Sequence, residues 1–110
     1  MKREERINII KKDFENANKI LSSIGDENRQ KILLTLLDSC KNGGMRVNDI
    51  AKKINLSRPA TSHHLKLLKE KNIIDIRKDG TKNFYYINGC DEILKLKTLI
   101  DNIELLIKER

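Results

Sequence analysis

The sequence predicts a mainly α-helical α+β domain with one small β-hairpin, in the order helix, helix, very short strand, helix, helix, strand, strand, helix. Three observations predict it. Apolar residues recur three or four positions apart in five segments, which is the period of an amphipathic helix. Two segments rich in β-branched and aromatic residues flank an Asp-Gly turn signal. The chain has 110 residues, enough for a single domain that spans residues 1–110.

The first predicted helix, residues 4–24, carries a continuous apolar stripe. This stripe is more apolar surface than the core of a small domain needs. We therefore expect it to pack partly on its own core and partly on a second subunit. The members of the stripe are Ile7, Ile10, Phe14, Ala17, Leu21 and Ile24.

The second helix is predicted from Asp26 to about Ser39. Gly25 interrupts the first helix, and the Asp26 carboxylate can accept hydrogen bonds from the first backbone N–H groups of the next one. Gly43-Gly44 then permits a tight turn, and residues 45–47 are expected as a very short strand able to pair with the hairpin. The buried face of this helix is predicted to carry Ile32, Leu33, Leu36 and Leu37.

Two short helices with a tight turn between them follow. Apolar residues in Val47–Ile54 have helical spacing, and only Asn55 and Leu56 separate this segment from Ser57. Ser57 can cap a helix with its hydroxyl, and Pro59 suits a first helical turn, where its missing N–H would have no partner. A helix over 57–69 is therefore expected to complete a helix-turn-helix.

Steps of 100° per residue divide the helix at 57–69 into two faces. The apolar face carries His64, which we expect to be a partly buried structural histidine. The other face begins with a guanidinium, a hydroxyl and an imidazole and ends with two ammonium groups, a mixture that suits base edges and phosphates. Arg58 is expected to read a base, with guanine as the best match for its donors, while the lysines meet phosphates or water. The candidate DNA-contacting residues here are Arg58, Pro59, Ser62, His63, Lys66 and Lys69.

The predicted hairpin, residues 73–78 and 82–87, directly follows this helix and turns at Asp79-Gly80. A hairpin in this position is a wing, so the fold is predicted to be a winged helix-turn-helix. Basic residues near the tip suit the DNA backbone or the minor groove, although they could also serve only to keep a hairpin in solution. The candidate DNA-contacting residues of the wing are Arg77, Lys78, Thr81 and Lys82.

Positive charge concentrates on the predicted reading helix and wing. The chain carries a net charge of +7, with 35% charged residues and a pI near 9.5. Residues 57–83 contribute +4, whereas residues 91–110 contribute −1. An anionic partner at this surface is expected, and double-stranded DNA is the obvious one. The alternative is a set of basic faces that only meet solvent.

The last helix, predicted over 91–109, carries a second long apolar stripe. Because a winged helix is already complete before it, this stripe must find another surface. We predict that it pairs with the same helix of a second chain, with residues 4–24 assisting, and that the C2 homodimer reads an imperfect inverted repeat. The stripe consists of Ile93, Leu96, Ile100, Ile103 and Ile107, with Leu99 and Leu106 beside it.

Residues 20–88 resemble the ArsR family of winged-helix bacterial repressors. The resemblance is carried by residues 21–33 (Leu-Ser-Ser-Ile-Gly-Asp-Glu-Asn-Arg-Gln-Lys-Ile-Leu), by residues 56–68 with their Ser-His-His-Leu core, and by Tyr85-Tyr86. The string Ser-Arg-Pro-Ala-x-Ser-His-His-Leu is far more specific than a bare helix-turn-helix spacing. The resemblance implies a homodimeric repressor that binds operator DNA and releases it when an effector arrives.

The chain departs from the family at its metal sites. Many metal-sensing members carry Cys-x-Cys where this chain reads Arg46-Val47-Asn48, and others pair carboxylates with histidine in a last helix that has no histidine here. The resemblance therefore implies an effector other than a metal at the usual sites, and neither a metal nor a cofactor is expected. Asp91 and Glu104 could hold a weak hard-metal site with a second subunit, although a solvated acidic face is favoured.

The two cysteines offer an alternative signal. Cys40 follows the second helix and Cys90 precedes the last one, and cytosolic cysteines are usually reduced. Some ArsR relatives sense oxidants or sulfur species with one cysteine in each of these helices, in a similar but not identical register. A thiol-redox-responsive repressor is therefore an alternative interpretation, since thiol reactivity depends on exposure and pKa.

Other function classes find less support in the sequence. No phosphate-cradling glycine loop or nucleophile with a base and an orienting group is present, so no enzyme is predicted. A winged-helix protein–protein adaptor and a sequence-indifferent nucleic-acid-binding protein stay open. The charged N-terminus is unlike a signal peptide and no run of 18 apolar residues exists, so a cytosolic protein without a membrane partner is expected.

Overall fold

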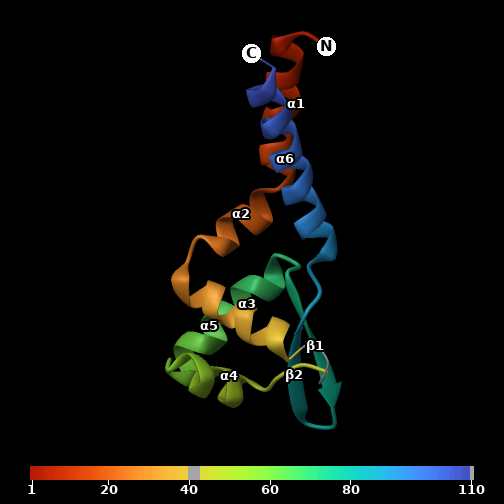
Figure 1. Cartoon of the computed structure of the whole chain (residues 1–110). Helices are drawn as coiled ribbons and strands as arrows, with labels where there is room; N and C mark the ends of the chain where they lie inside the picture. Colours follow the sequence, from red (N-terminus) through yellow and green to blue (C-terminus); the bar gives the residue numbers. More distant parts are fainter. Residues whose placement is uncertain (40–42, 110) are drawn as a thin grey trace.

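The computed structural model describes residues 1–39 and 43–109 and divides them into a stalk and a body (Figure 1). Helices α1 and α6 run side by side as the stalk, and both chain termini lie at its far end. α2 leads from the stalk to a body made of three helices and a two-stranded hairpin. The elements are α1 (Arg3–Asn16), α2 (Asn18–Ile24), α3 (Glu27–Asp38), α4 (Val47–Ile54), α5 (Arg58–Glu70), β1 (Ile74–Asp79), β2 (Lys82–Ile87) and α6 (Cys90–Lys108).

The predicted first helix is two helices, so the prediction of one continuous helix was wrong at Ala17. Ala17 has φ −91° and ψ 6°, although its N–H still donates to the Asp13 carbonyl at 2.9 Å and its carbonyl accepts from the Leu21 N–H at 3.0 Å. Asn16 and Asn18 flank the break, and amide side chains weaken a helix interior because they compete for backbone hydrogen bonds. The break lets α1 follow α6 while α2 turns toward the body.

The core lies between α3, α4, α5 and the hairpin, and it continues through α2 into the stalk, where Ile10 and Leu99 are buried. α3 begins as predicted, because the Asp26 carboxylate accepts from the Arg29 N–H at 3.0 Å. Its expected buried face is correct in part, since Leu33 is half-buried and Leu37 is exposed. Each fully buried aliphatic side chain contributes roughly 1.5–3 kcal/mol. These side chains are Ile20, Ile32, Leu36, Ile50, Leu65, Leu68 and Ile74.

The wing is an antiparallel hairpin with Ile74 opposite Ile87 and Asp79 opposite Lys82. Gly80 is the first of the two turn residues and has φ +63°. Two-residue hairpin turns favour glycine at this position because it adopts positive φ without strain. The expected strand at 45–47 is reduced to one residue, Met45, because Val47 already begins α4. Met45 and Tyr85 exchange backbone hydrogen bonds of 2.9 and 2.7 Å, which attach the wing to the segment before α4.

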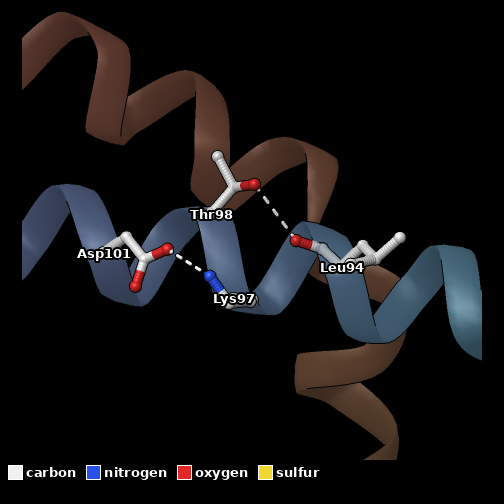
Figure 2. A network of polar contacts seen from close by, with 4 residues as sticks. All are labelled: Leu94, Lys97, Thr98 and Asp101. Carbon is white, nitrogen blue, oxygen red and sulfur yellow. Dashed lines mark hydrogen bonds and ion pairs between the residues drawn. The ribbon is translucent and has the colours of Figure 1, made fainter.

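The stalk is held by both apolar and polar contacts. Leu99 is buried, the Asn102 amide donates to the Asp13 carboxylate at 2.6 Å, and Arg6 pairs with Glu109. Asp101 lies 2.9 Å from the Lys97 ammonium on the outer side of α6, and this hydrogen bond raises the pKa of Lys97 (Figure 2). None of the helices in the described residues is long and apolar enough to cross a membrane.

Candidate nucleic-acid interface

α5 presents a continuous exposed polar side. Its start is set by Ser57, whose hydroxyl accepts from the Ala60 N–H at 3.2 Å, with Pro59 in the first turn. Thr61 and Leu65 are buried on the opposite side, so the face assignment made from the sequence agrees with the observed burial. The exposed residues include every candidate of this helix, and their contact with DNA stays a prediction. They are Arg58, Pro59, Ser62, His63, Lys66 and Lys69.

The turn before α5 depends on one left-handed residue. Asn55 has φ 56° and ψ 50°, a conformation that asparagine tolerates better than most residues. The next N–H, of Leu56, donates to the Ala51 carbonyl at 3.0 Å and closes the end of α4. This geometry fixes α5 against α4, so the exposed side of α5 is held on a rigid support.

The four wing candidates do not behave alike. Lys78, Thr81 and Lys82 are exposed around the tip. Arg77 instead donates to the Gly43 carbonyl at 3.2 Å, and its guanidinium lies 4.6 Å from the centre of the Phe84 ring. The hydrogen bond to Gly43 gives Arg77 a role in attaching the wing, which the sequence analysis missed because Gly43 lies 34 positions earlier in the chain. Phe84 is the cross-strand neighbour of Arg77 within the hairpin.

A pocket of about 180 Å³ lies between the start of α4, the first turns of α5 and the wing. It brings together Arg58, Ser62 and Thr81 among the predicted residues, whereas the lysines of α5 and of the wing do not line it. It also adds residues that the sequence analysis did not propose. The expected pairing of residues 45–47 with the hairpin was the signal that could have located them. The walls include Arg46 just before α4, Asn48 on α4, Arg58 and Ser62 on α5, and Asn83 and Tyr85 on β2.

A second, more open hollow adjoins this pocket. It runs between α4 and the start of α5, and Asn48 and Arg58 line both hollows. Lys52 and Ser57 also line it. Together the two hollows reach from α4 to the wing, and Arg58 lines both. The pocket beside the wing is mainly polar, whereas Ala51 and Leu56 add apolar lining to the more open hollow.

His64 points to the interior side of α5, as expected from its place on the apolar face. It is half-buried, and its Nδ1 lies 3.5 Å from the Arg29 guanidinium. Arg29 also donates to the carbonyls of Ser23 at 2.8 Å and Ser22 at 3.4 Å. A guanidinium can only donate, so this contact is a hydrogen bond in the tautomer that leaves Nδ1 of His64 unprotonated. Arg29 thus connects the reading helix to the end of α2.

The residues considered for sensing are dispersed. Cys40 lies outside the described residues, and Cys90 is an exposed free thiol at the start of α6. Asp91 and Glu104 are 13 positions apart on one helix, a rise of about 20 Å, and Glu104 pairs with Lys108 at 3.1 Å. Over residues 1–39 and 43–109, no group of three His, Cys, Asp or Glu side chains is placed to hold a metal ion.

Comparison with known proteins adds three findings. Residues 26–75 match the model of the bacterial regulatory protein arsR family. The chain is 41% identical over 85 residues to an uncharacterized HTH-type transcriptional regulator of Methanocaldococcus jannaschii, covering 76% of this chain and 92% of that protein. It is 31% identical over 90 residues to the arsenical resistance operon repressor of Staphylococcus aureus, covering 80% of this chain and 83% of that protein.

The same fold occurs among solved structures. The homodimeric winged helix-turn-helix DNA-binding domain of a Mycobacterium bovis protein is similar with a TM-score of 0.59 and 23% identity. The match covers 83% of this chain and 82% of that domain.

Proposed function

Because the chain belongs to the ArsR family of bacterial regulatory proteins, we propose that it is a sequence-specific DNA-binding transcriptional repressor. The observation that carries this proposal is the continuous polar surface formed by α5, the start of α4 and the wing. It combines a guanidinium able to reach base edges with several groups able to bind phosphates. Base contacts supply sequence preference, and phosphate contacts supply affinity and orientation.

The proposed repressor is a homodimer formed through the stalk. Ile93, Ile100 and Ile107 are spaced by seven residues and are all exposed, at 51%, 54% and 65%. Such a row on α6 suits a second copy of the same helix, and Phe14 on α1 is exposed at 48% nearby in the stalk. A C2 dimer carries two copies of α5, so the expected operator is an imperfect inverted repeat.

The homodimer proposal is supported by the similar Mycobacterium bovis domain, which is itself homodimeric. The proposal also has a physical motive, because a chain of 110 residues buries a modest fraction of its surface alone. Pairing of two stalks would cover apolar side chains that otherwise meet water.

We propose that the protein releases DNA when it binds an effector, and that this effector is not a metal ion bound at the positions used by metal-sensing members of the family. Those positions hold Arg46-Val47-Asn48, which offer no thiolate, and the described part of α6 contains no histidine. An effector that prefers one dimer geometry would shift the population toward it. α2 joins the stalk to α3, and Arg29 joins α2 to α5, so a change in stalk packing has a physical route to the reading helix.

The test is equilibrium binding of the purified, reduced protein to its own upstream DNA and to a scrambled duplex of equal length at near-physiological salt. A preference of roughly a thousandfold for the upstream DNA is expected of a specific regulator. Equal affinity for both duplexes with a steep salt dependence would instead identify a sequence-indifferent binder. Binding to an acidic protein but to neither duplex would identify an adaptor.

A further inference from the structure

The pocket between α4, α5 and the wing is lined by two cations from different elements. Arg46 immediately precedes α4, and Arg58 begins α5. Of the described residues that line the pocket, none is an aspartate or a glutamate. The local electrostatic field therefore favours an anion, and two like charges beside one concavity repel each other unless an anion lies between them.

The chemistry of the lining groups is specific for oxyanions. A guanidinium offers a planar fork of donors that matches two oxygens of a phosphate, and neither Arg46 nor Arg58 is in an ion pair with any described residue. Asn48 and Asn83 add amide donors, and Ser62 adds a hydroxyl. Amide and hydroxyl groups are common ligands of the DNA backbone.

The pocket is built before any ligand arrives. Met45, next to Arg46, exchanges two backbone hydrogen bonds with Tyr85, and Tyr85 lines the pocket. Asn83 lies two residues before Tyr85 on the same strand, so it points to the same side of the hairpin. One backbone pairing therefore fixes the main chain at Arg46 relative to the main chain at Asn83, which lowers the cost of ordering the two side chains around a ligand.

We propose that this pocket binds one phosphodiester group of the DNA backbone beside the base pairs that α5 contacts, with Arg46 as its principal ligand. The inference rests on the proposed function, because the phosphate belongs to the bound DNA. The bound phosphate sets the depth and register of α5 in the major groove, since the same pocket is walled by α5 and by the wing. Arg46 thus orients the reading helix and carries no sequence preference of its own.

The experiment compares wild-type protein with Arg46→Gln at several salt concentrations, on both the upstream duplex and the scrambled duplex. Without the Arg46 guanidinium, both complexes are expected to weaken by the same factor, roughly tenfold or more. The slope of log K against log salt should decrease by about 0.9 for each phosphate that is no longer neutralised, hence by about 1.8 for a dimer. Arg46→Lys keeps the charge and is expected to keep the slope.

Arg3→Gln is the matched control, because it removes the same exposed charge from α1 in the stalk. It should leave both affinities and the slope unchanged. Thermal unfolding of each variant, followed by circular dichroism, should give melting temperatures close to that of the wild type, because all the substituted residues are exposed.

A second measurement locates the phosphate. Duplexes in which single phosphates are replaced by neutral methylphosphonates should lose affinity for the wild-type protein at one position in each half-site. Arg46→Gln should be insensitive at that position. An Arg46→Gln protein that keeps the wild-type slope and the wild-type sensitivity pattern would overturn the pocket while leaving the proposed function standing. A wild-type protein that binds neither duplex would overturn both.

Discussion

Arg58 is the residue on which sequence preference is expected to depend. It is exposed in the first turn of α5 and lines both hollows of the proposed DNA surface. A bidentate contact with guanine contributes about 1–3 kcal/mol of discrimination. Arg58→Ala should therefore weaken binding to the upstream DNA by a factor of about ten or more and weaken the scrambled complex less, so that the ratio of the two affinities narrows.

Equilibrium titration of both duplexes measures this ratio. Lys69→Ala is a suitable comparison, because Lys69 is exposed on the same side of α5 but at its last turn. If Lys69 contacts only phosphates or solvent, Lys69→Ala should leave the ratio of the affinities for the upstream and scrambled duplexes unchanged. An Arg58→Ala protein that weakens equally on both duplexes would show that Arg58 contacts only the backbone.

The charge of the Asp26 carboxylate, which caps α3, is expected to stabilise that helix. The backbone N–H of Arg29 donates to Asp26 and is the largest cause of the lowered pKa of this carboxyl, with the charges of Arg29 and His64 acting in the same direction. A carboxyl whose pKa is lower in the folded protein than in the unfolded chain stabilises the folded protein at pH values above the ordinary pKa of 3.8. This contribution disappears as the pH falls through the lower pKa of the folded state.

The prediction is tested with Asp26→Asn, since asparagine can cap a helix but does not titrate. Wild type should have the higher melting temperature near neutral pH, and the difference should shrink as the solution is acidified below the ordinary pKa of aspartate. A difference that is constant from neutral to strongly acidic pH would show that the Asp26 charge does not stabilise α3.

At the scale of elements, attachment of the wing depends on a close backbone approach at Gly44. Gly44 has φ +103°, and a Cβ added there would lie 2.4 Å from the Tyr85 carbonyl oxygen. Gly44→Ala should therefore strain the turn and separate Met45 from Tyr85, at a cost of roughly 1–3 kcal/mol in the free energy of unfolding. Urea denaturation measures this change.

Gly25→Ala is the matched control for the wing prediction. Gly25 has φ −76° and ψ −14°, and nothing lies within 4 Å of an added Cβ. The substitution should be neutral or stabilise the fold by up to about 1 kcal/mol, because alanine restricts the unfolded chain. Equal midpoints for the two variants would refute the close approach at Gly44.

At the scale of the whole molecule, a row of exposed isoleucines, Ile93, Ile100 and Ile107, runs along α6 in the stalk. Ile100 and Leu94 are both 54% exposed on α6, but a step of 100° per residue places them about 120° apart around the helix. The Lys97–Asp101 pair lies on the side of α6 between them, with Leu94 beside it in Figure 2. Only Ile100 belongs to the row formed with Ile93 and Ile107.

Ile100→Lys should therefore raise the dimer dissociation constant at least about tenfold, because two charges would be buried at a C2 interface. Leu94→Lys should leave it unchanged. Sedimentation at several protein concentrations measures both constants. A wild-type chain that stays monomeric when concentrated, or equal effects of the two substitutions, would refute this interface.

The features that the sequence predicted correctly depend on residues close together in the chain. Ser57 and Pro59 begin α5, Asp26 begins α3, and Gly80 turns the wing, and each acts within a few residues of its own position. The spacing of apolar residues likewise located the helices, because helical periodicity is a local property. These signals were sufficient for the winged helix-turn-helix and for the exposed side of α5.

What only the tertiary structure decided depends on contacts between distant segments. The break at Ala17 accompanies a change of partners: α1 packs on α6, whereas α2 contacts both α6 and α3. Arg77 is held by the Gly43 carbonyl, 34 positions earlier in the chain. Arg46 joins Arg58 in one pocket because Met45 pairs with Tyr85. Periodicity identifies which side of a helix is apolar, but which of those residues a neighbour covers is set by packing between elements that the local sequence does not specify.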